Sequence, residues 1–472
     1  MASPLSNPVY RNLFAAQVIA LAGTGLTTVA LALLAYDLAG GDAGAVLGTA
    51  LALKMVAYVG VAPIVGGLAH HIPRRAFLIG LDIGRATIIA SMPFVTDVWQ
   101  VYVLIFLLNA FSAGFTPTFQ ATIPDILPDE KQYTRALSLS RLAYDLENLL
   151  SPSLAAAALA FVSYHTLFGA NAIAFLVSAA LVFSVQLPIH KAQARAQGIL
   201  RNITHGTTIY LKTPRLRGLL ALSFAASCAG AMVIVNTVVY VRDYLGGAET
   251  EAAIAYAAYG GGSMIIALLL PRLLDTRSDR PFMLAGGIVL ALGLTASVTS
   301  PNFAGLMCLW FVLGIGGSLI QTPAGRLLKR SAHDADRPAI YSAQFALSHA
   351  GWLVAYLFAG KIGAASSLSV AFIVLALLAL LSTGVAAFAW PRRDPMVVEH
   401  THDSVEHEHL HVHDEHHQHS HEGWEGPEPH SHPHRHGPIR HSHAFVLDAH
   451  HPKWPNCQLA RPTPNLRTAP RQ

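Results

Sequence analysis

Charged side chains are scarce in this sequence: they make up 12% of 472 residues, whereas 53% of the residues are hydrophobic. A soluble globular chain carries about 25% charged residues, so the composition excludes a soluble enzyme. Apolar stretches of about 20 residues, the length that a bilayer core requires of a helix, recur along most of the chain. The composition therefore predicts a polytopic membrane protein whose first span is retained and is not cleaved as a signal peptide.

Cysteine is nearly absent too. The three cysteines, Cys228, Cys308 and Cys457, are too few and too scattered for a disulfide framework or a thiolate metal site. No G-x-x-x-x-G-K-[ST] nucleotide-binding loop occurs, which disfavours an ATP-driven pump, and no catalytic constellation is found. The formal net charge of +4 gives no support for nucleic-acid binding. These absences favour a transporter over an enzyme.

Hydropathy places twelve spans in two sets of six. They lie near residues 12–36, 45–69, 76–96, 99–121, 142–162 and 165–187, and near 217–243, 250–274, 281–299, 302–322, 338–361 and 366–390. The longest polar connection, residues 188–216, separates the sets and has the composition of a cytosolic linker. We predict an all-α membrane fold of two six-helix bundles, residues 1–187 and 217–390, followed by a tail at 391–472.

Basic residues are distributed unevenly between the two sides of the predicted membrane. Loops after even-numbered spans and the linker are rich in Lys and Arg, whereas the opposite loops offer little beyond Arg242 and Lys361. Because cytoplasmic loops carry the excess of positive charge, both termini are predicted to face the cytosol. An odd number of spans would place the basic linker outside, which this asymmetry disfavours.

The two halves show internal repetition. The short basic loops Gly66–Arg75 and Pro271–Arg280 follow the second and eighth spans, and Thr116-Pro117 in the fourth span corresponds to Thr322-Pro323 in the tenth. Parallel halves are typical of transporter folds built by repetition. The twelve spans, the basic linker and the two loops resemble the major facilitator superfamily of secondary transporters over about residues 10–390.

The resemblance implies gating roles for the repeated loops. They are similar to that superfamily's signature G-x-L-x-D-R-x-G-R-R, with His70 in place of Asp and Pro73 in place of Gly. The implied gating residues are Arg74, Arg75, Asp275 and Arg280. In the fifth span, Ser151–Ala156 resembles the antiporter signature G-P-x-x-G-G, with small residues substituting for glycine.

The segment after Trp390 has a different composition. Residues 400–451 contain eighteen of the 25 histidines, and few residues there could build a core, so we expect a disordered tail. Neutral imidazole suits divalent Ni, Cu and Zn, and H-x-H spacing lets several rings converge on one ion. The predicted metal ligands are His407, His409, His411, His413, His416, His417, His419, His421, His430, His432, His434 and His436. A merely solubilising tail is the alternative.

A facilitator-type body with such a tail, together with the fifth-span run Tyr144–Pro152, resembles nickel-resistance permeases of the NreB type. That resemblance implies proton-coupled efflux of Ni²⁺ from the cytosol across a bacterial inner membrane, which confers metal tolerance. We expect a monomer without a tightly bound cofactor, with the metal ion as substrate and tail ligand. The sequence does not choose among Ni²⁺, Co²⁺ and Zn²⁺, because selectivity depends on geometry.

Ionisable groups inside spans are costly, so each of them indicates a nearby partner for its charge or a water-filled path. The fifth span carries Asp145, Glu147 and Asn148, and the eleventh carries Gln344 and His349. Since Asp145 and Asn148 are three residues apart and share a helix face, we favour Asp145 over Glu147 for the cavity. A carboxylate that holds a proton and a metal ion in turn is a sufficient basis for antiport.

Other interpretations of these charges stay open. Instead of a role in the transport path, Asp145 could form a structural ion pair with Arg135 or Arg141. His349 could likewise make a simple contact between helices. Asp82 and Arg85, three residues apart in the third span, most simply neutralise each other. Lys54 in the second span has no partner that the sequence identifies, beyond a pairing with Asp145 or a role in repelling cations.

Two further functions are compatible with the sequence. An exporter of siderophores or other small organic molecules would have a pocket lined by aromatic residues and Arg. A membrane-tethered metal buffer would sequester nickel with its tail, and the body would transport little.

Overall fold

The computed structural model describes most of the helical part of the chain and short segments of its C-terminal part. The described residues are 3–39, 43–68, 72–188, 199–299, 301–334, 336–392, 394, 397–402, 405–411, 430–436, 439–444, 446 and 454. The chain divides into two compact units, residues 1–392 and 393–472.

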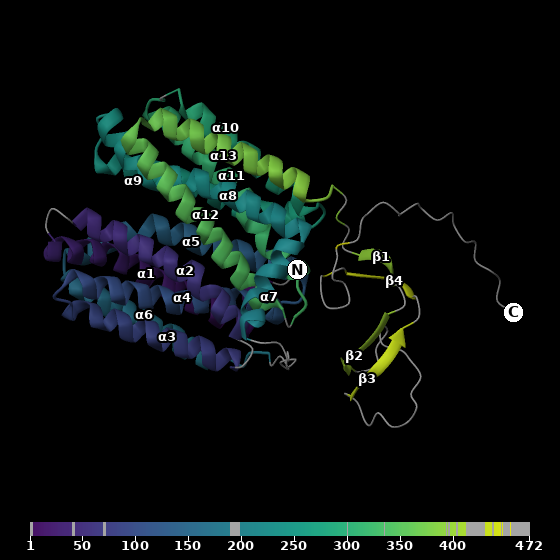
Figure 1. The fold of residues 1–472 in the computed structure, drawn as a ribbon. Coiled ribbons are helices and arrows are strands. Elements are labelled where there is room, and N and C mark those ends of the chain that lie inside the picture. The colour runs from purple at the N-terminus through teal and green to yellow at the C-terminus, as the bar shows by residue number, and fades with distance from the viewer. Residues whose placement is uncertain are drawn as a thin grey trace. The chain divides into compact units, whose positions relative to one another are not determined.

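The first unit consists of helices in two groups, seen side by side in Figure 1. The N-terminal half contains α1 (Pro8–Ala39), α2 (Ala43–Leu68), α3 (Arg74–Ser91), α4 (Val98–Ile126), α5 (Glu130–Leu159) and α6 (Tyr164–Phe183). The C-terminal half contains α8 (Pro214–Val239), α9 (Glu249–Leu274), α10 (Asp279–Ser297), α11 (Phe303–Arg330), α12 (Arg337–Ala365) and α13 (Leu368–Ala389). Single turns η1 (Pro4–Ser6), η4 (Met92–Phe94) and η5 (Tyr240–Tyr244) flank α1, α3 and α8.

Within the described residues, eleven helices are long and apolar enough to cross a membrane. Of the six helices in each half, the one that falls outside this group is α5, although it is 30 residues long. It carries six charged residues, Glu130, Lys131, Arg135, Arg141, Asp145 and Glu147. It still packs between α1 and α9, in the place of the predicted fifth span, so neighbouring helices cover its polar groups.

A side-chain cap starts α5 well before the limit that hydropathy gives. Asp129 accepts a hydrogen bond from the backbone N–H of Gln132 (2.8 Å), so α5 begins twelve residues before the predicted fifth span. Such a cap satisfies an N–H group that has no partner inside the helix, and Asp129 is polar, so a hydropathy window excludes it. Asn302 caps α11 in the same way, through the N–H of Gly305 (3.0 Å), and it lies at the predicted start of the tenth span.

The polar segment between the halves contains one helix that hydropathy does not predict, α7 (Ile199–Lys212). It packs against α2 of one half and α12 of the other. His205 Nε2 lies 3.1 Å from Asp336 Oδ1 beside the start of α12. The connection between the two bundles is therefore not only a loop, because it includes a helix that contacts both halves.

Helices α9 and α11 approach each other so closely that their contact requires glycine. A Cβ at Gly314 of α11 would overlap the backbone carbonyl of Tyr259 in α9, and a Cβ at Gly262 of α9 would overlap the carbonyl of Phe311. Small residues let helix backbones pack at short range inside a membrane. The same contact positions α9 against α5.

Gly314→Ala is expected to destabilise the protein by about 1–3 kcal/mol, because a methyl group has no space against a backbone carbonyl. Gly260→Ala is the matched control, since a Cβ at Gly260 of α9 meets no atom within 4 Å. Thermal unfolding of both detergent-solubilised variants measures the difference. Equal transition temperatures for the two variants would contradict the close-packing account.

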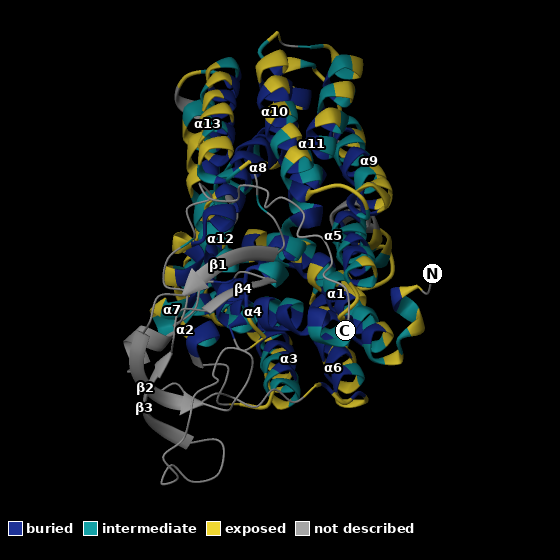
Figure 2. Ribbon diagram, turned by 90° about the vertical axis from the view of Figure 1, so that its right-hand side faces the viewer, coloured by how far each residue is buried: buried dark blue, intermediate teal, exposed yellow. Residues whose placement is uncertain are grey.

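Apolar side chains cover much of the outer surface of the first unit. Figure 2 shows exposed residues alternating with buried ones along α9, α10 and α13. Phe388 is 92% exposed and Leu381 66% exposed, both on α13. Apolar exposure distributed over many helices is what a hydrocarbon solvent permits, and it agrees with a multi-pass membrane protein.

The second unit contains four short strands. β1 (Val397–His402) pairs antiparallel with β4 (Ile439–Ala444), and β2 (Val405–His411) pairs with β3 (His430–His436). The sequence predicts a tail without fixed structure, whereas the described residues of the tail form these strands. The H-x-H alternation has the two-residue period of a strand, although a two-stranded ladder alone is only marginally stable in water.

The strand register places predicted metal ligands opposite one another. His407, His409 and His411 are paired with His434, His432 and His430. The remaining predicted tail ligands, His413, His416, His417, His419 and His421, lie outside the described residues, as does His70 of the first repeated loop. The backbone of His436 lies in β3, opposite Val405.

Candidate translocation site

The two halves meet along α2, α4 and α5 of the N-terminal half and α9, α11 and α12 of the C-terminal half. α2 and α4 pack on α12, and α5 packs on α9 and α11. Polar side chains on these helices lie where a transporter built from two repeats binds its substrate.

Asp145 of α5 forms a closed polar network. Its Oδ1 lies 2.8 Å from Nη2 of Arg141, and its Oδ2 accepts a hydrogen bond from Ser263 Oγ of α9 (2.6 Å). Arg141 also donates to Gln321 Oε1 of α11 (2.6 Å). Asp145 is only 5% exposed. Both carboxylate oxygens thus have partners, and the network ties α5 to α9 and α11, which corresponds to the ion-pair alternative for this residue.

Glu147 lies in a different environment from Asp145. It is half-buried near the middle of α5, and its Oε1 lies beside Gly25 of α1, 3.2 Å from where a Cβ would be placed. No described side chain donates a hydrogen bond to its carboxylate. The positive charge of Lys54, on α2, acts on it electrostatically. Of the two acids, Glu147 is therefore the one that stays open to a ligand.

His349 of α12 has a defined tautomer when its ring is neutral. Its Nδ1 lies 2.7 Å from the backbone carbonyl oxygen of Phe345. Because a carbonyl only accepts hydrogen bonds, Nδ1 must carry the proton, and the neutral ring then has a lone pair on Nε2. A histidine that binds a metal commonly donates its other N–H to a carbonyl in this way.

An aromatic side chain connects Lys54 to His349. The ammonium of Lys54 lies 5.6 Å from the ring centroid of Tyr58, one turn further along α2. The Tyr58 ring meets the His349 ring edge-on, with centroids 4.8 Å apart. We call Lys54, Glu147 and His349 the central polar cluster. Each residue is near the middle of its helix, and the charge of Lys54 acts on both others.

The central polar cluster has free coordination capacity. Among the described residues, no side chain forms a hydrogen bond or ion pair with the Glu147 carboxylate, the Lys54 ammonium or His349 Nε2. The described residues also contain no group of three or more His, Cys, Asp or Glu that could hold a metal ion. The Glu147 carboxylate and His349 Nε2 are therefore the two groups of this cluster that could accept a ligand.

The other predicted path residues lie apart from this cluster. The side chain of Gln344 accepts a hydrogen bond from the hydroxyl of Tyr210 on α7 and donates to Ser223 Oγ of α8 (3.3 Å). Gln344 therefore links α12 to α7, the helix between the halves, and to α8. The backbone of Asn148 is helical, and its side chain lies outside the described part of the chain.

Asp82 and Arg85 of α3 form the predicted ion pair inside the N-terminal half. Ser178 of α6 donates a hydrogen bond to Asp82 Oδ2 (2.8 Å). The Arg85 guanidinium lies 4.0 Å and 4.4 Å from the ring centroids of Phe115 and Phe175. The pair is buried and its two charges neutralise each other, which indicates a structural role.

Ion pairs join the two halves at one end, which we call the basic end, formed by the end of α4 and the starts of α3, α5 and α12. Asp125 of α4 accepts hydrogen bonds from Arg74 of its own half and from Arg337 of the other half. Arg326 of α11 binds Glu130 of α5 (2.6 Å). Contacts across the boundary of the halves therefore close this end.

The remaining predicted gating residues bind within their own halves. Arg75 donates to the carbonyl of Phe183, and Arg280 donates to the carbonyls of Trp390 (3.1 Å) and Ala387 (2.9 Å). Asp275 ends α9, and the acid paired in this region is Asp279, 3.3 Å from Arg326. Sequence reasoning missed Asp125 as a residue that joins the two halves, because its partners are far away in the chain.

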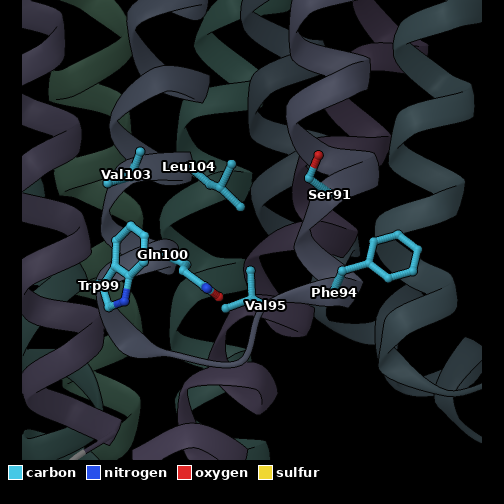
Figure 3. A pocket seen from close by; sticks show the side chains of 7 residues that line it. All are labelled: Ser91, Phe94, Val95, Trp99, Gln100, Val103 and Leu104. Atoms are coloured by element: carbon cyan, nitrogen blue, oxygen red, sulfur yellow. The ribbon is translucent and has the colours of Figure 1, made fainter.

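A separate pocket lies between α3, η4 and α4. Figure 3 shows its lining, Ser91, Phe94, Val95, Trp99, Gln100, Val103 and Leu104. Phe94 is 81% exposed and Trp99 63% exposed. No charged side chain lines the pocket, and none of the predicted path residues belongs to it, so the central polar cluster is the better candidate for the functional site.

Comparisons with known proteins agree with this architecture. A model of the Major Facilitator Superfamily matches residues 13–242 and 219–412. The uncharacterized MFS-type transporter YfiS of Bacillus subtilis is 25% identical over 340 residues, which cover 68% of this chain and 79% of that protein. Macrolide efflux protein A of Enterococcus faecalis is 21% identical over 236 residues, or 48% of this chain and 73% of that protein.

Solved structures show the same fold at lower identity. The human organic anion transporter MFSD10 (TETRAN) has a TM-score of 0.71 at 11% identity, covering 80% of this chain and 99% of that one. The transporter FucP in the outward conformation has a TM-score of 0.64 at 12% identity, covering 81% of this chain and 98% of that one. Both likenesses support the arrangement of the helices and leave the substrate open.

Proposed function

The chain belongs to the Major Facilitator Superfamily and is a multi-pass transporter, not an enzyme, and we propose that it exports divalent nickel in exchange for protons. The observation that carries the proposal is that Lys54 acts electrostatically on an open carboxylate of the N-terminal half, Glu147, and on an imidazole of the C-terminal half, His349. One carboxylate oxygen and one imidazole nitrogen form a mixed ligand set that suits a partly hydrated Ni²⁺ ion. Co²⁺ is the second metal of the proposal.

The proposed orientation follows from the charge distribution. The basic end faces the cytosol of a bacterial inner membrane, because Lys and Arg are concentrated there. Both termini then lie in the cytosol as well. In this orientation the ion pairs of Asp125 close the cytosolic end.

Proton coupling follows from the chemistry of the ligands. A carboxyl group and an imidazole must both be deprotonated before they bind a metal. Metal binding from the cytosol thus releases protons, and reprotonation from outside displaces the metal. The two halves separate in turn at the two ends, as in transporters built from repeats. Glu147 moves with the N-terminal half and His349 with the C-terminal half.

The histidine-rich tail is proposed as an accessory metal reservoir. Its H-x-H pattern offers imidazole ligands in the cytosol. The alternative, in which the tail alone buffers nickel, would leave the body without measurable flux. Deleting residues 395–472 and assaying transport separates the two.

The test is uptake of radiolabelled nickel into inverted membrane vesicles with an acidic interior. An exporter in this orientation moves nickel into the vesicles as protons leave, so uptake should collapse when a protonophore removes the gradient. Vesicles with the full chain and with the chain lacking residues 395–472 should both accumulate nickel. If neither shows gradient-dependent uptake of nickel, cobalt or zinc, the proposal is wrong; if only tail-containing membranes retain nickel, independently of the gradient, the buffer is the function.

Export of a small organic molecule is the second candidate. The rings of Tyr58 and Phe345 lie 4.9 Å apart beside His349, and Trp352 lies less than a turn further along α12. Flat organic substrates stack on such rings. A relative is named for macrolide efflux and a structural neighbour for organic anions. A siderophore or macrolide that is itself taken up by the vesicles, with no metal flux, would favour this function.

A further inference from the structure

Lys54 is a positive charge in the middle of an apolar helix, where it is half-buried. A charged side chain at this depth is costly unless it serves a function. Among the described residues, none forms a hydrogen bond or ion pair with its ammonium, which lies 5.6 Å from the centroid of the Tyr58 ring. Its charge acts on Glu147, but no ion pair joins the two. A negatively charged ligand is therefore the kind of partner that this ammonium would bind.

Aromatic rings lie beside Lys54, where α2 of one half meets α12 of the other. The Tyr58 ring meets the rings of Phe345 and His349 edge-on, with centroids 4.9 Å and 4.8 Å apart. The rings of Phe345 and His349 are themselves 4.1 Å apart. We call these three residues the ring contact. Because the Lys54 ammonium lies next to one of its rings, a ligand of Lys54 would lie beside an aromatic surface.

The register of α2 on α12 brings a further aromatic residue to the level of Lys54. Gly66 of α2 lies against Ser342 of α12 near the basic end, and the ring contact follows further from that end, so the two helices run antiparallel. About one turn beyond the ring contact, α2 carries Lys54 and α12 carries Trp352. No described residue accepts a hydrogen bond from the Trp352 indole N–H. The ammonium and the indole N–H only donate, which favours a ligand with acceptor oxygens.

We propose that Lys54 binds the carboxylate of an aromatic chelator that accompanies the metal through the site. The inference rests on the proposed function and names the form in which the metal travels. The described residues contain no group of three or more His, Cys, Asp or Glu that could hold a metal ion, so an organic ligand would supply coordination that these side chains do not. A carboxylate oxygen left free by the metal accepts a charge-assisted hydrogen bond from the ammonium, and the flat ring stacks on Tyr58 or Trp352.

The test measures gradient-driven uptake of radiolabelled nickel into inverted vesicles that contain the full chain. Nickel is supplied alone or with one equimolar pyridine compound. Picolinate has its carboxylate next to the ring nitrogen and chelates nickel, whereas isonicotinate has the same ring and carboxylate but cannot chelate. Aminomethylpyridine, with the amine next to the ring nitrogen, chelates without a carboxylate. Vesicles without the protein give the background.

We expect picolinate to raise kcat/KM for nickel by about tenfold or more in the wild type, since the complex gains a hydrogen bond to a charged group. The other two compounds should give no such gain. Lys54→Met should lose the gain while it still takes up nickel supplied alone, and Lys54→Arg, which keeps a permanent positive charge, should retain it. Lys361→Met, at an exposed position of α12, is the control and should behave as the wild type.

The outcomes separate this inference from the proposed function. Wild-type uptake of nickel without any gain from picolinate would overturn the inference and leave the proposed function standing. An equal gain in Lys54→Met, or an equal gain from aminomethylpyridine, would also overturn it, because neither the ammonium nor the carboxylate would then matter. If the wild type shows no gradient-dependent uptake with or without picolinate, the proposed function fails and the inference fails with it.

Discussion

Glu147→Gln is expected to abolish gradient-driven nickel uptake while the protein still folds and inserts. The amide has nearly the shape of the carboxylate, but it cannot carry the negative charge that holds a divalent ion or the proton exchanged for it. No described residue depends on Glu147 for a hydrogen bond, so the helix packing is expected to stay intact. We expect a loss of at least about a hundredfold in kcat/KM, of the order of about 3 kcal/mol.

The matched control is Asp145→Asn, two residues earlier on the same helix. Asp145 binds Arg141 and Ser263 and holds α5 against α9. Its replacement should lower thermal stability, because a buried ion pair is broken, and uptake by the folded fraction should persist. Nickel uptake into inverted vesicles and thermal unfolding of the purified variants measure the two effects. Full uptake by Glu147→Gln together with its loss in Asp145→Asn would reverse our assignment.

The contrast between these two acids shows what a sequence cannot supply. Helical periodicity correctly separates the faces of Asp145 and Glu147. It does not show which neighbour each face meets. Ser263, which binds Asp145, is 118 positions away in the chain, and only the packing of α5 on α9 brings them together. The prediction for Asp145 relied on its own helix, and the other half of the protein determines its environment.

Hydropathy predicted the spanning helices well because the bilayer imposes a simple rule on apolar length. Helix ends and α7 were harder to predict. The polar cap Asp129 lies outside the apolar run, and α7 is an amphipathic helix of 14 residues in a polar segment. The strong local pair Asp82–Arg85 was predictable, since residues three apart on a helix are neighbours.

The ion pairs of the basic end were the least predictable part of the structure. The repeated loops correctly drew attention to Arg74, but its partner Asp125 is 51 residues away and Arg337 is 212 residues from Asp125. An isolated acid at the end of a span has no sequence pattern. The structure shows that this one carboxylate connects arginines from both halves, so the stability of the closed basic end depends on it.

Asp125→Asn is therefore expected to open the basic end. The Asp125 side chain is 2% exposed, and those of Arg74 and Arg337 are 13% and 11% exposed. Loss of the negative charge leaves two arginines close together without a shared partner, and breaking a buried ion pair costs about 3–5 kcal/mol. Because the asparagine oxygen still accepts one hydrogen bond, we expect a smaller shift toward the open state, about 10- to 100-fold in population.

Ala339 is a suitable reporter of this opening. It lies at the start of α12 and is 8% exposed, packed under Gly66 of α2 and Gly206 of α7. In a background without the three native cysteines, Ala339→Cys should react slowly with a water-soluble maleimide, and at least about tenfold faster when Asp125→Asn is added. Lys131→Gln, an exposed charge change at the same end, should leave the rate unchanged. Equal labelling rates with and without Asp125→Asn would mean that the Tyr133–Tyr341 contact (2.7 Å) and Arg326 keep the end closed without Asp125.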